Sequence, residues 1–196
     1  MNAFETAISA GGVVIFPSDT VYGLACDPGD EDAIARLYTL KGRPPDKAAA
    51  VMFFDLSAAL AALPELGSAT QAALRGLMPG GVTALLPNPV HRFPLACRAD
   101  PETLGLRVIS VRALGAVGLP VLQSSANPSG GPEARRLDEV DVAIRARVTL
   151  EIDGGELPGV PSTVVDLRNY ERDRSWAIVR DGLVASDVIA AALADR

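Results

Sequence analysis

The sequence predicts an α/β fold in which helices pack on a twisted mixed sheet. Short apolar runs typical of buried strands alternate along the chain with Ala- and Leu-rich stretches typical of helices. In addition, 48% of the 196 residues are hydrophobic, and this length lies within the roughly 100–200 residues of a typical domain. We therefore expect one domain over residues 1–196, without an additional C-terminal domain.

The elements of the first half follow from start and stop signals in the chain. A helix over Asn2–Ala10 precedes a buried strand over Val13–Phe16, which Pro17 is expected to stop. Asp30 is a good N-cap for a helix that runs to Lys41. The other expected elements of this half are strands over Ala48–Phe54, Val82–Leu86 and Leu104–Ile109 and helices over Ser57–Leu63 and Ser68–Leu77.

The second half continues the same alternation. A strand over Val121–Ser124 runs into the loop Ser125–Pro132, which is rich in Ser, Gly, Asn and Pro. A helix is expected over Leu137–Arg147, and Ser186 is expected to cap a final helix that runs to Ala194. The remaining expected elements are a short helix over Val111–Val117 and strands over Val148–Ile152, Thr163–Leu167 and Trp176–Val179.

The scarcity of histidine and cysteine excludes several site chemistries. His91 is the single histidine, and the two cysteines are Cys26 and Cys97. These residues are too few for a His-rich or Cys-rich zinc site, so we expect no metal-ligating residues. No Gly-x-Ser-x-Gly elbow accompanies His91, to which we assign no catalytic role. The cysteines are expected to be buried free thiols, which fits a reducing cytoplasm.

Charge and hydropathy narrow the class of partner. The net charge of −6 argues against broad, sequence-independent binding of nucleic acid. Two lysines are too few for a polybasic membrane anchor, and apolar runs such as Ala48–Phe54 are far shorter than the ~20 residues of a membrane helix. The first ten residues lack the basic region of a signal peptide. We therefore expect a cytoplasmic protein without membrane association.

The loop Lys41–Lys47 concentrates positive charge. It contains both lysines of the chain together with Arg43, and Gly42 and two prolines restrict its backbone. Cations at the C-terminus of a helix interact favourably with its dipole, so one interpretation is helix capping. The other is an anion site, because fixed guanidinium and ammonium groups suit a polyphosphate.

Other polar loops border predicted strands, where a rigid sheet would position them. Pro17–Gly23 carries three hydroxyls and a carboxylate, and Gln123–Gly131 offers hydroxyls, an amide and backbone N–H groups suited to phosphate. Gly159–Asp166 enters one strand, and Arg180 ends another. Each is also compatible with an ordinary polar turn. Arg107 lies in an apolar run, where a buried guanidinium requires a carboxylate or a ligand anion.

In this order, the segments resemble the YrdC-domain family of threonylcarbamoyl-AMP synthases. Lys41-Gly42-Arg43 and Ser125-Ala126-Asn127 match its Lys-x-Arg and Ser-x-Asn signature. Pro17–Gly23 is similar to its Pro-Thr-Glu-Thr-Val-Tyr-Gly segment, and Met78–Thr83 to its Trp-Pro-Gly-Pro-Leu-Thr segment. Further matches are Ser162–Asp166 and Arg180-x-Gly182, so the resemblance covers roughly residues 12–184.

The resemblance implies a YrdC-like fold with an open concave substrate pocket. It implies a nucleotidyltransferase that condenses L-threonine, bicarbonate and ATP, accompanied by Mg²⁺, to threonylcarbamoyl-AMP and pyrophosphate. A downstream tRNA threonylcarbamoyl transferase would then modify adenosine 37 of tRNA. Because the substrate supplies the nucleophile, such a site needs positioning and charge neutralisation rather than a protein nucleophile.

The resemblance also implies roles for individual residues. It assigns catalysis to Lys41, Arg43, Ser125 and Asn127. It assigns ATP binding to Arg43, Thr103, Ser125, Glu133 and Arg180. It assigns threonine binding to Thr20, Tyr22, Arg107, Gln123 and Ser162, and it assigns no residue to a metal.

The chain departs from the family pattern at several positions. Lys47 stands where the family has Asn, Met52 where it has His, and Glu133 where a Ser often contacts ATP. Two alternatives therefore stay open. One is a diverged YrdC paralogue that binds nucleotide but uses another acceptor. The other is a non-catalytic module that binds tRNA or double-stranded RNA.

Overall fold

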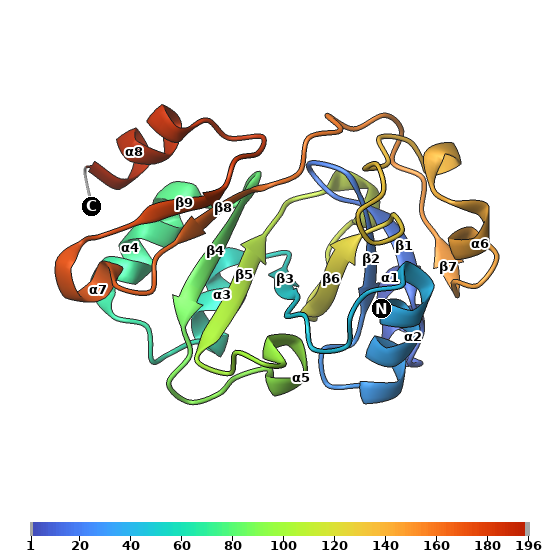
Figure 1. Ribbon diagram of the computed structural model, residues 1–196, viewed down its shortest axis with the longest axis horizontal. Helices are drawn as coiled ribbons and strands as arrows, with labels where there is room; N and C mark the ends of the chain where they lie inside the picture. Colours follow the sequence, from blue (N-terminus) through green and yellow to red (C-terminus); the bar gives the residue numbers. More distant parts are fainter. Residues whose placement is uncertain (1, 195–196) are drawn as a thin grey trace.

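The alternation of strands and helices builds one mixed sheet. Over residues 2–194, which the computed structural model describes, the sheet has nine strands in the order β7-β1-β2-β6-β3-β5-β4-β8-β9 (Figure 1). The strands are β1 Val14–Pro17, β2 Tyr22–Cys26, β3 Ala50–Phe53, β4 Val82–Pro87, β5 Thr103–Val108, β6 Val121–Ser125, β7 Leu150–Glu151, β8 Thr163–Asp166 and β9 Ala177–Arg180. Parallel pairing joins β1 to β7, β3 to β5 and β4 to β8, and the other neighbours are antiparallel. The predicted mixed sheet is confirmed.

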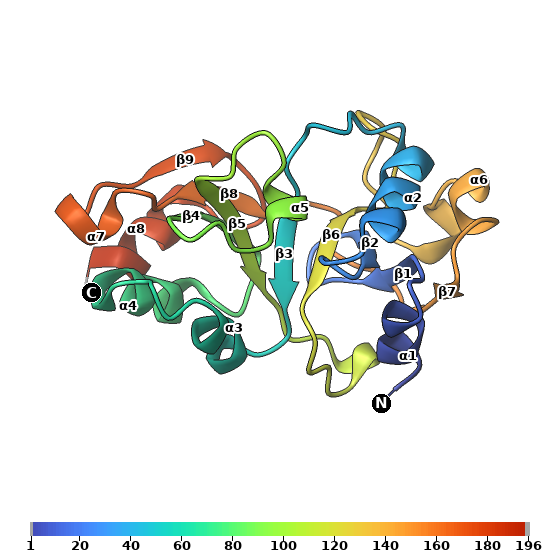
Figure 2. The same ribbon diagram turned by 90° about the horizontal axis from the view of Figure 1, so that it is seen from below.

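Helices lie around both halves of the sheet. The α-helices are α1 Ala3–Ser9, α2 Glu31–Lys41, α3 Leu56–Ala62, α4 Ser68–Leu77, α5 Pro94–Cys97, α6 Val142–Arg145, α7 Tyr170–Asp173 and α8 Ser186–Ala194, with 3-10 turns η1 Arg112–Leu114 and η2 Leu137–Glu139. In Figures 1 and 2, α4 and α8 flank the end of the sheet that carries β8 and β9, whereas α1, α2 and α6 surround the end that carries β1 and β7. No helix among the described residues is long and apolar enough to cross a membrane.

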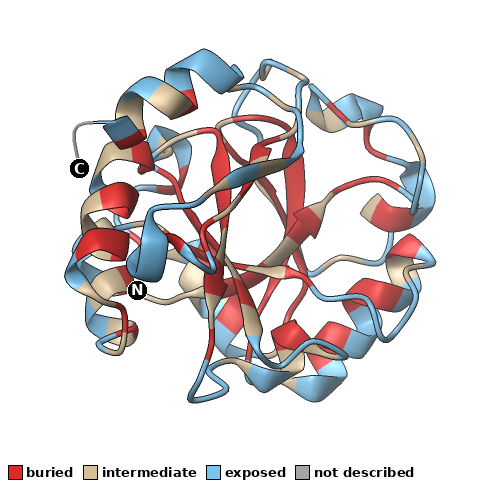
Figure 3. Cartoon of the chain, turned by 60° about the vertical axis from the view of Figure 1, so that its left-hand side comes forward, coloured by how far each residue is buried: buried red, intermediate tan, exposed pale blue. Residues whose placement is uncertain are grey.

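The core explains why several strands appear in the sequence as continuous apolar runs. Strands β1 and β2 are buried at every position, because helices cover both faces of this part of the sheet. The larger cluster joins the sheet to α2, α4 and α8, and a second cluster packs Phe4 of α1 against Phe16 of β1 with ring centroids 5.7 Å apart. Figure 3 shows the buried residues concentrated on the strands and the inner helix faces.

Two predicted helices are shorter in the structure. Leu137–Arg147 is divided into η2 and α6, because Val140 is extended (φ −68°, ψ 133°) and Asp141 caps α6 by accepting a backbone N–H at 2.7 Å. Val111–Val117 retains the single turn η1, because Gly115 has a positive φ of 65° and ends it. Both predictions missed a local break inside an otherwise helical composition.

The sequence pattern also misses β2, α5 and α7. Pro17 does not stop its strand: it is the last residue of β1 and pairs with Tyr22. Strand β2 then lies between β1 and β6, so Tyr22 and Gly23, the last two residues of a segment interpreted as a polar loop, belong to a β-hairpin. The polar turn therefore consists of residues 18–21 only. Its side chains are held at the end of a buried hairpin.

The two cysteines are buried and free, as predicted. Burial raises the pKa of Cys26 to about 12 and also raises the pKa of Cys97. Because the thiolate is the reactive form, we expect neither cysteine to react with DTNB in the folded protein at pH 8. Both are expected to react after unfolding in guanidinium chloride. Rapid labelling of the folded chain would contradict this burial.

Candidate functional site

A cavity of about 400 Å³ lies on one face of the sheet and contains most of the predicted site residues. From the predicted set, it is lined by Thr20, Arg43, Thr103, Arg107, Gln123, Ser125, Glu133, Ser162 and Arg180. The other lining residues are Val21, Ala48, Ala49, Ala50, Thr83, Leu85, Asp100, Gly105, Ser124, Pro161 and Val164. The segments that meet here are far apart in sequence, and the sheet brings them together.

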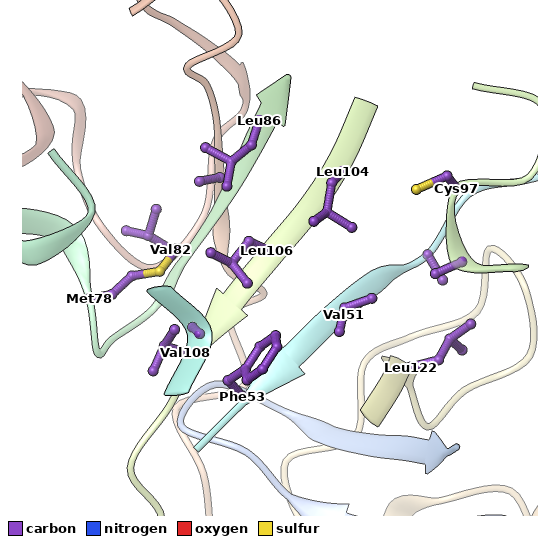
Figure 4. Close-up of a cluster of buried hydrophobic side chains, with 14 of the residues drawn as sticks. Val51, Phe53, Met78, Val82, Leu86, Cys97, Leu104, Leu106, Val108 and Leu122 are labelled. Carbon is purple, nitrogen blue, oxygen red and sulfur yellow. The ribbon is translucent and has the colours of Figure 1, made fainter. Parts of the chain in front are cut away.

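The two-residue period of β5 explains how one strand serves both the cavity and the core. Thr103, Gly105 and Arg107 face the cavity, and the intervening Leu104 and Leu106 are buried in the core. Figure 4 shows Leu104 and Leu106 beside core residues of β3, β4 and β6. Arg107 therefore interrupts an apolar run because its side chain faces the cavity, whereas the neighbouring Leu104 and Leu106 face the core.

Arg107 is a buried cation that is held by the β1–β2 turn. Its side chain forms an ion pair with Asp19, and Nη2 donates to Thr20 Oγ1 at 2.9 Å. Ser18 fixes this turn, because its Oγ lies 2.9 Å from Thr20 Oγ1. Burial lowers the pKa of Arg107, and Asp19 opposes that effect. Arg107 Nε and Asp19 Oδ2 are buried without a hydrogen-bond partner in the described part of the chain.

A second chain of contacts beside the cavity joins β4, the residue that precedes β8 and the last residue of β9. Thr83 Oγ1 and Ser162 Oγ lie 2.8 Å apart. Arg180 Nη2 donates to the Ser162 carbonyl at 2.7 Å and lies 3.3 Å from Ser162 Oγ. The contacts place a guanidinium beside two hydroxyls, an arrangement suited to binding oxygen atoms of an anion.

Lys41 connects the two signature motifs but is not among the residues that line the cavity. Its ammonium donates to Ser125 O, to Asn127 O at 2.6 Å and to Asn127 Oδ1 at 3.3 Å. Asn127 Nδ2 in turn donates to Gly131 O at 2.6 Å, and Ser129 N–H donates to Lys41 O at 2.7 Å. Burial lowers the pKa of Lys41 to about 8. Lys41 and Asn127, both predicted to be catalytic, therefore fix the loop whose Ser125 lines the cavity.

Tyr38 supports Arg43, the other cation of the signature. The Arg43 guanidinium lies 5.4 Å from the centroid of the Tyr38 ring, and the Tyr38 hydroxyl donates to Lys47 O at 2.7 Å. Arg43 N–H also donates to Tyr38 O at 2.9 Å. Sequence reasoning missed Tyr38. Its position three residues before Lys41, on the same face of α2, was the available signal.

Tyr22 does not line the cavity, contrary to the expectation that it contacts threonine. Its side chain is buried in the core with Leu24 and Cys26, which share its face of β2. The Tyr22 hydroxyl donates to Asp153 Oδ1 at 2.8 Å and accepts from Gly154 N–H at 2.9 Å. These contacts tie β2 to the segment that follows β7.

The positions at which the chain departs from the family pattern are also placed. Met52 is fully buried in the smaller core cluster, and Lys47 is exposed, so neither lines the cavity. Glu133 does line it. His91 is exposed and contacts Glu102 outside the cavity.

The electrostatics of the cavity favour an anionic ligand. Three guanidinium groups line it, and Arg43 Nε and Arg107 Nε are buried without a partner in the described residues. Unpaired buried donors cost free energy, which a bound acceptor would recover. The lining holds hydroxyls, three cations and the carboxylates of Asp100 and Glu133, but no histidine or cysteine, so it is suited to binding and orienting oxygen-rich groups.

Comparison with known proteins shows the family to which this fold and cavity belong. The family model for Sua5, YciO and YrdC, described as telomere recombination, matches residues 6–182. The chain belongs to the Sua5/YciO/YrdC family. Among curated members of this family, it is 32% identical over 176 residues to the threonylcarbamoyl-AMP synthase of Xanthomonas campestris, covering 86% of this chain and 93% of the relative. It is 37% identical over 171 residues to that of Chromohalobacter salexigens, covering 84% and 91%.

Solved structures of Sua5/YciO/YrdC proteins share the fold. P. abyssi Sua5 complexed with L-threonine matches with a TM-score of 0.82 and 26% identity, covering 95% of this chain and 55% of that one. This chain therefore spans little more than half the length of Sua5. E. coli YciO matches with a TM-score of 0.76 and 26% identity, covering 94% and 89%. The expected YrdC-like fold is confirmed.

Proposed function

We propose that this protein is a threonylcarbamoyl-AMP synthase, a nucleotidyltransferase that uses L-threonine, bicarbonate and ATP. The observation that carries the proposal is the cavity, which is lined by one residue of each signature motif, Arg43 and Ser125, together with a buried, incompletely paired Arg107. Relatives of that name, 32–37% identical over most of the chain, support it.

The cavity residues divide into two sets by the role that we propose for them. Arg107, with Thr20, would bind the carboxylate of threonine, and Gln123 and Ser162 would complete the threonine site. Arg43 and Ser125 would contact the phosphates, with Thr103, Glu133 and Arg180 completing the ATP site. Mg²⁺ bound with ATP would neutralise phosphate charge.

The chemistry required fits residues that orient and neutralise. The threonine amine and bicarbonate form a carbamate with loss of water. A carbamate oxygen then bonds to the α-phosphorus of ATP, and the bond to the β-phosphate oxygen breaks to release pyrophosphate. Guanidinium groups beside the reacting oxygens would stabilise the charge that develops. The product would pass to a tRNA threonylcarbamoyl transferase.

The test is pyrophosphate release by the purified protein, with threonine, bicarbonate or ATP omitted in turn. We expect release to require all three. ATP turnover that is independent of threonine would instead indicate a paralogue with another acceptor. Salt-sensitive binding of tRNA without any turnover would indicate the RNA-binding alternative.

Tyr38 provides a further prediction, because it supports Arg43 through its ring and the loop through its hydroxyl. Tyr38→Leu is expected to weaken binding of a non-hydrolysable ATP analogue about tenfold, and Tyr38→Phe roughly two- to fivefold because the ring remains. Isothermal titration calorimetry measures both. Tyr170→Phe is a matched control, since Tyr170 also packs against an arginine and donates to a backbone carbonyl, but outside the cavity. If Tyr38→Leu and Tyr38→Phe bind the ATP analogue as tightly as Tyr170→Phe does, Tyr38 does not support the nucleotide site.

A further inference from the structure

Glu133 lines the cavity, and one oxygen of its carboxylate lacks a hydrogen-bond partner within residues 2–194. Its Oε2 atom is buried and has no hydrogen-bond partner among the residues that the structure describes. An ionised carboxylate only accepts hydrogen bonds, and burial without a donor or a cation costs free energy. A bound group that supplies positive charge or a donor would remove this cost.

The backbone on both sides of Glu133 is anchored. On one side, Gly131 O accepts from Asn127 Nδ2 at 2.6 Å. On the other, Ala134 is buried and its carbonyl accepts from Tyr22 N–H at 2.9 Å. Glu133 is therefore presented to the cavity from a fixed segment, which reduces the entropy that a ligand contact must overcome.

The surroundings of Glu133 favour a cation as its partner. Lys41 is close enough that the Glu133 charge raises its pKa in opposition to burial. However, the Lys41 ammonium donates to Ser125 and Asn127, and neither a hydrogen bond nor an ion pair joins it to Glu133 in the described residues. Phosphate oxygens and a carboxylate are both acceptors and repel each other at short range. A divalent cation joins the two, and Mg²⁺ characteristically binds one or two carboxylates together with substrate phosphates.

We propose that Glu133 is a protein ligand of the Mg²⁺ that enters the cavity with ATP. This inference rests on the proposed function. The described residues contain no group of three His, Cys, Asp or Glu side chains able to hold a metal, so phosphate oxygens and water would complete the coordination. Glu133 then makes nucleotide affinity depend on the metal: it opposes ATP alone and favours Mg-ATP.

The test compares binding of the analogue AMPPNP with Mg²⁺ and with EDTA by isothermal titration calorimetry. In the wild type, we expect Mg²⁺ to tighten binding. Glu133→Gln is expected to bind metal-free AMPPNP about three- to tenfold more tightly than the wild type, because a like charge is removed, and to lose most of the Mg²⁺ enhancement. Glu133→Asp, which keeps the charge, is expected to retain part of that enhancement. Glu31→Gln, at an exposed position of α2, controls for net charge.

A second readout is independent of turnover. The electron paramagnetic resonance signal of Mn²⁺ with AMPPNP is expected to show a tightly bound ion in the wild type and a weaker one in Glu133→Gln. If Glu133→Gln weakens AMPPNP equally with and without metal, Glu133 contacts the nucleoside and the proposal is wrong. Unchanged affinities in both conditions would also overturn it. If the wild type does not bind AMPPNP at all, the proposed function is wrong as well. If it binds AMPPNP equally with and without Mg²⁺, only the inference about Glu133 is wrong.

Discussion

Replacing Arg107 with lysine is expected to lower kcat/KM for L-threonine by about two to three orders of magnitude. Arg107 pairs with Asp19 and donates to Thr20, and its Nε is buried without a partner in the described chain. A planar guanidinium can hold these groups and a substrate carboxylate at once, whereas an ammonium can neutralise Asp19 but cannot reach all of them. Pyrophosphate release at varied threonine concentration measures the effect.

The variant retains a positive charge opposite Asp19, which limits the loss of stability that an unpaired buried carboxylate would cause. Thermal unfolding and AMPPNP affinity are therefore expected to change little. Arg92→Lys is the matched control, because Arg92 forms an exposed ion pair with Glu65 outside the cavity. Threonine kinetics within twofold of the wild type, or selective loss of nucleotide binding, would show that Arg107 does not bind the amino acid.

The sequence predicts the fold class because hydrophobic period and turn residues agree along most of the chain. The exceptions are local. Strand β2 was obscured because a motif rich in hydroxyls runs directly into it, and α5 and α7 are four-residue helices too short to produce a period. The division between η2 and α6 depends on the cap at Asp141, which composition does not distinguish from a polar helical position.

The candidate site was predictable as a set of motifs, but not as a geometry. Tyr22 was misplaced because its orientation depends on the register of β2, which places it with Leu24 on the core face. The contacts of Lys41 with the Ser-x-Asn loop and the support that Tyr38 gives Arg43 both arise from loops that fold back on α2. The period of a helix or strand predicts which residues share one face of that element, but it does not predict contacts such as these between an element and a loop.

Lys41→Met is expected to reduce kcat/KM for ATP by about 100-fold, although Lys41 does not line the cavity. The substitution removes the donor that holds Ser125 O, Asn127 O and Asn127 Oδ1, so the Ser-x-Asn loop loses its fixed position. The loss of stability is expected to be smaller, about 1–3 kcal/mol, because removing a buried ammonium also removes its desolvation cost. Lys47→Met is the matched control, since Lys47 is exposed in the same loop.

The pH dependence of stability tests this arrangement separately from activity. Folding lowers the pKa of Lys41 from 10.5 to about 8, so between these values the unfolded chain holds a proton that the folded chain has released. Raising the pH through this window therefore favours the folded state. The stability of the wild type relative to Lys41→Met is expected to rise from pH 8 to 10.5, as measured by urea unfolding. The difference in stability between the wild type and Lys47→Met is expected to stay nearly constant over the same pH range. If the difference between the wild type and Lys41→Met is also constant, Lys41 is not held in a desolvated site.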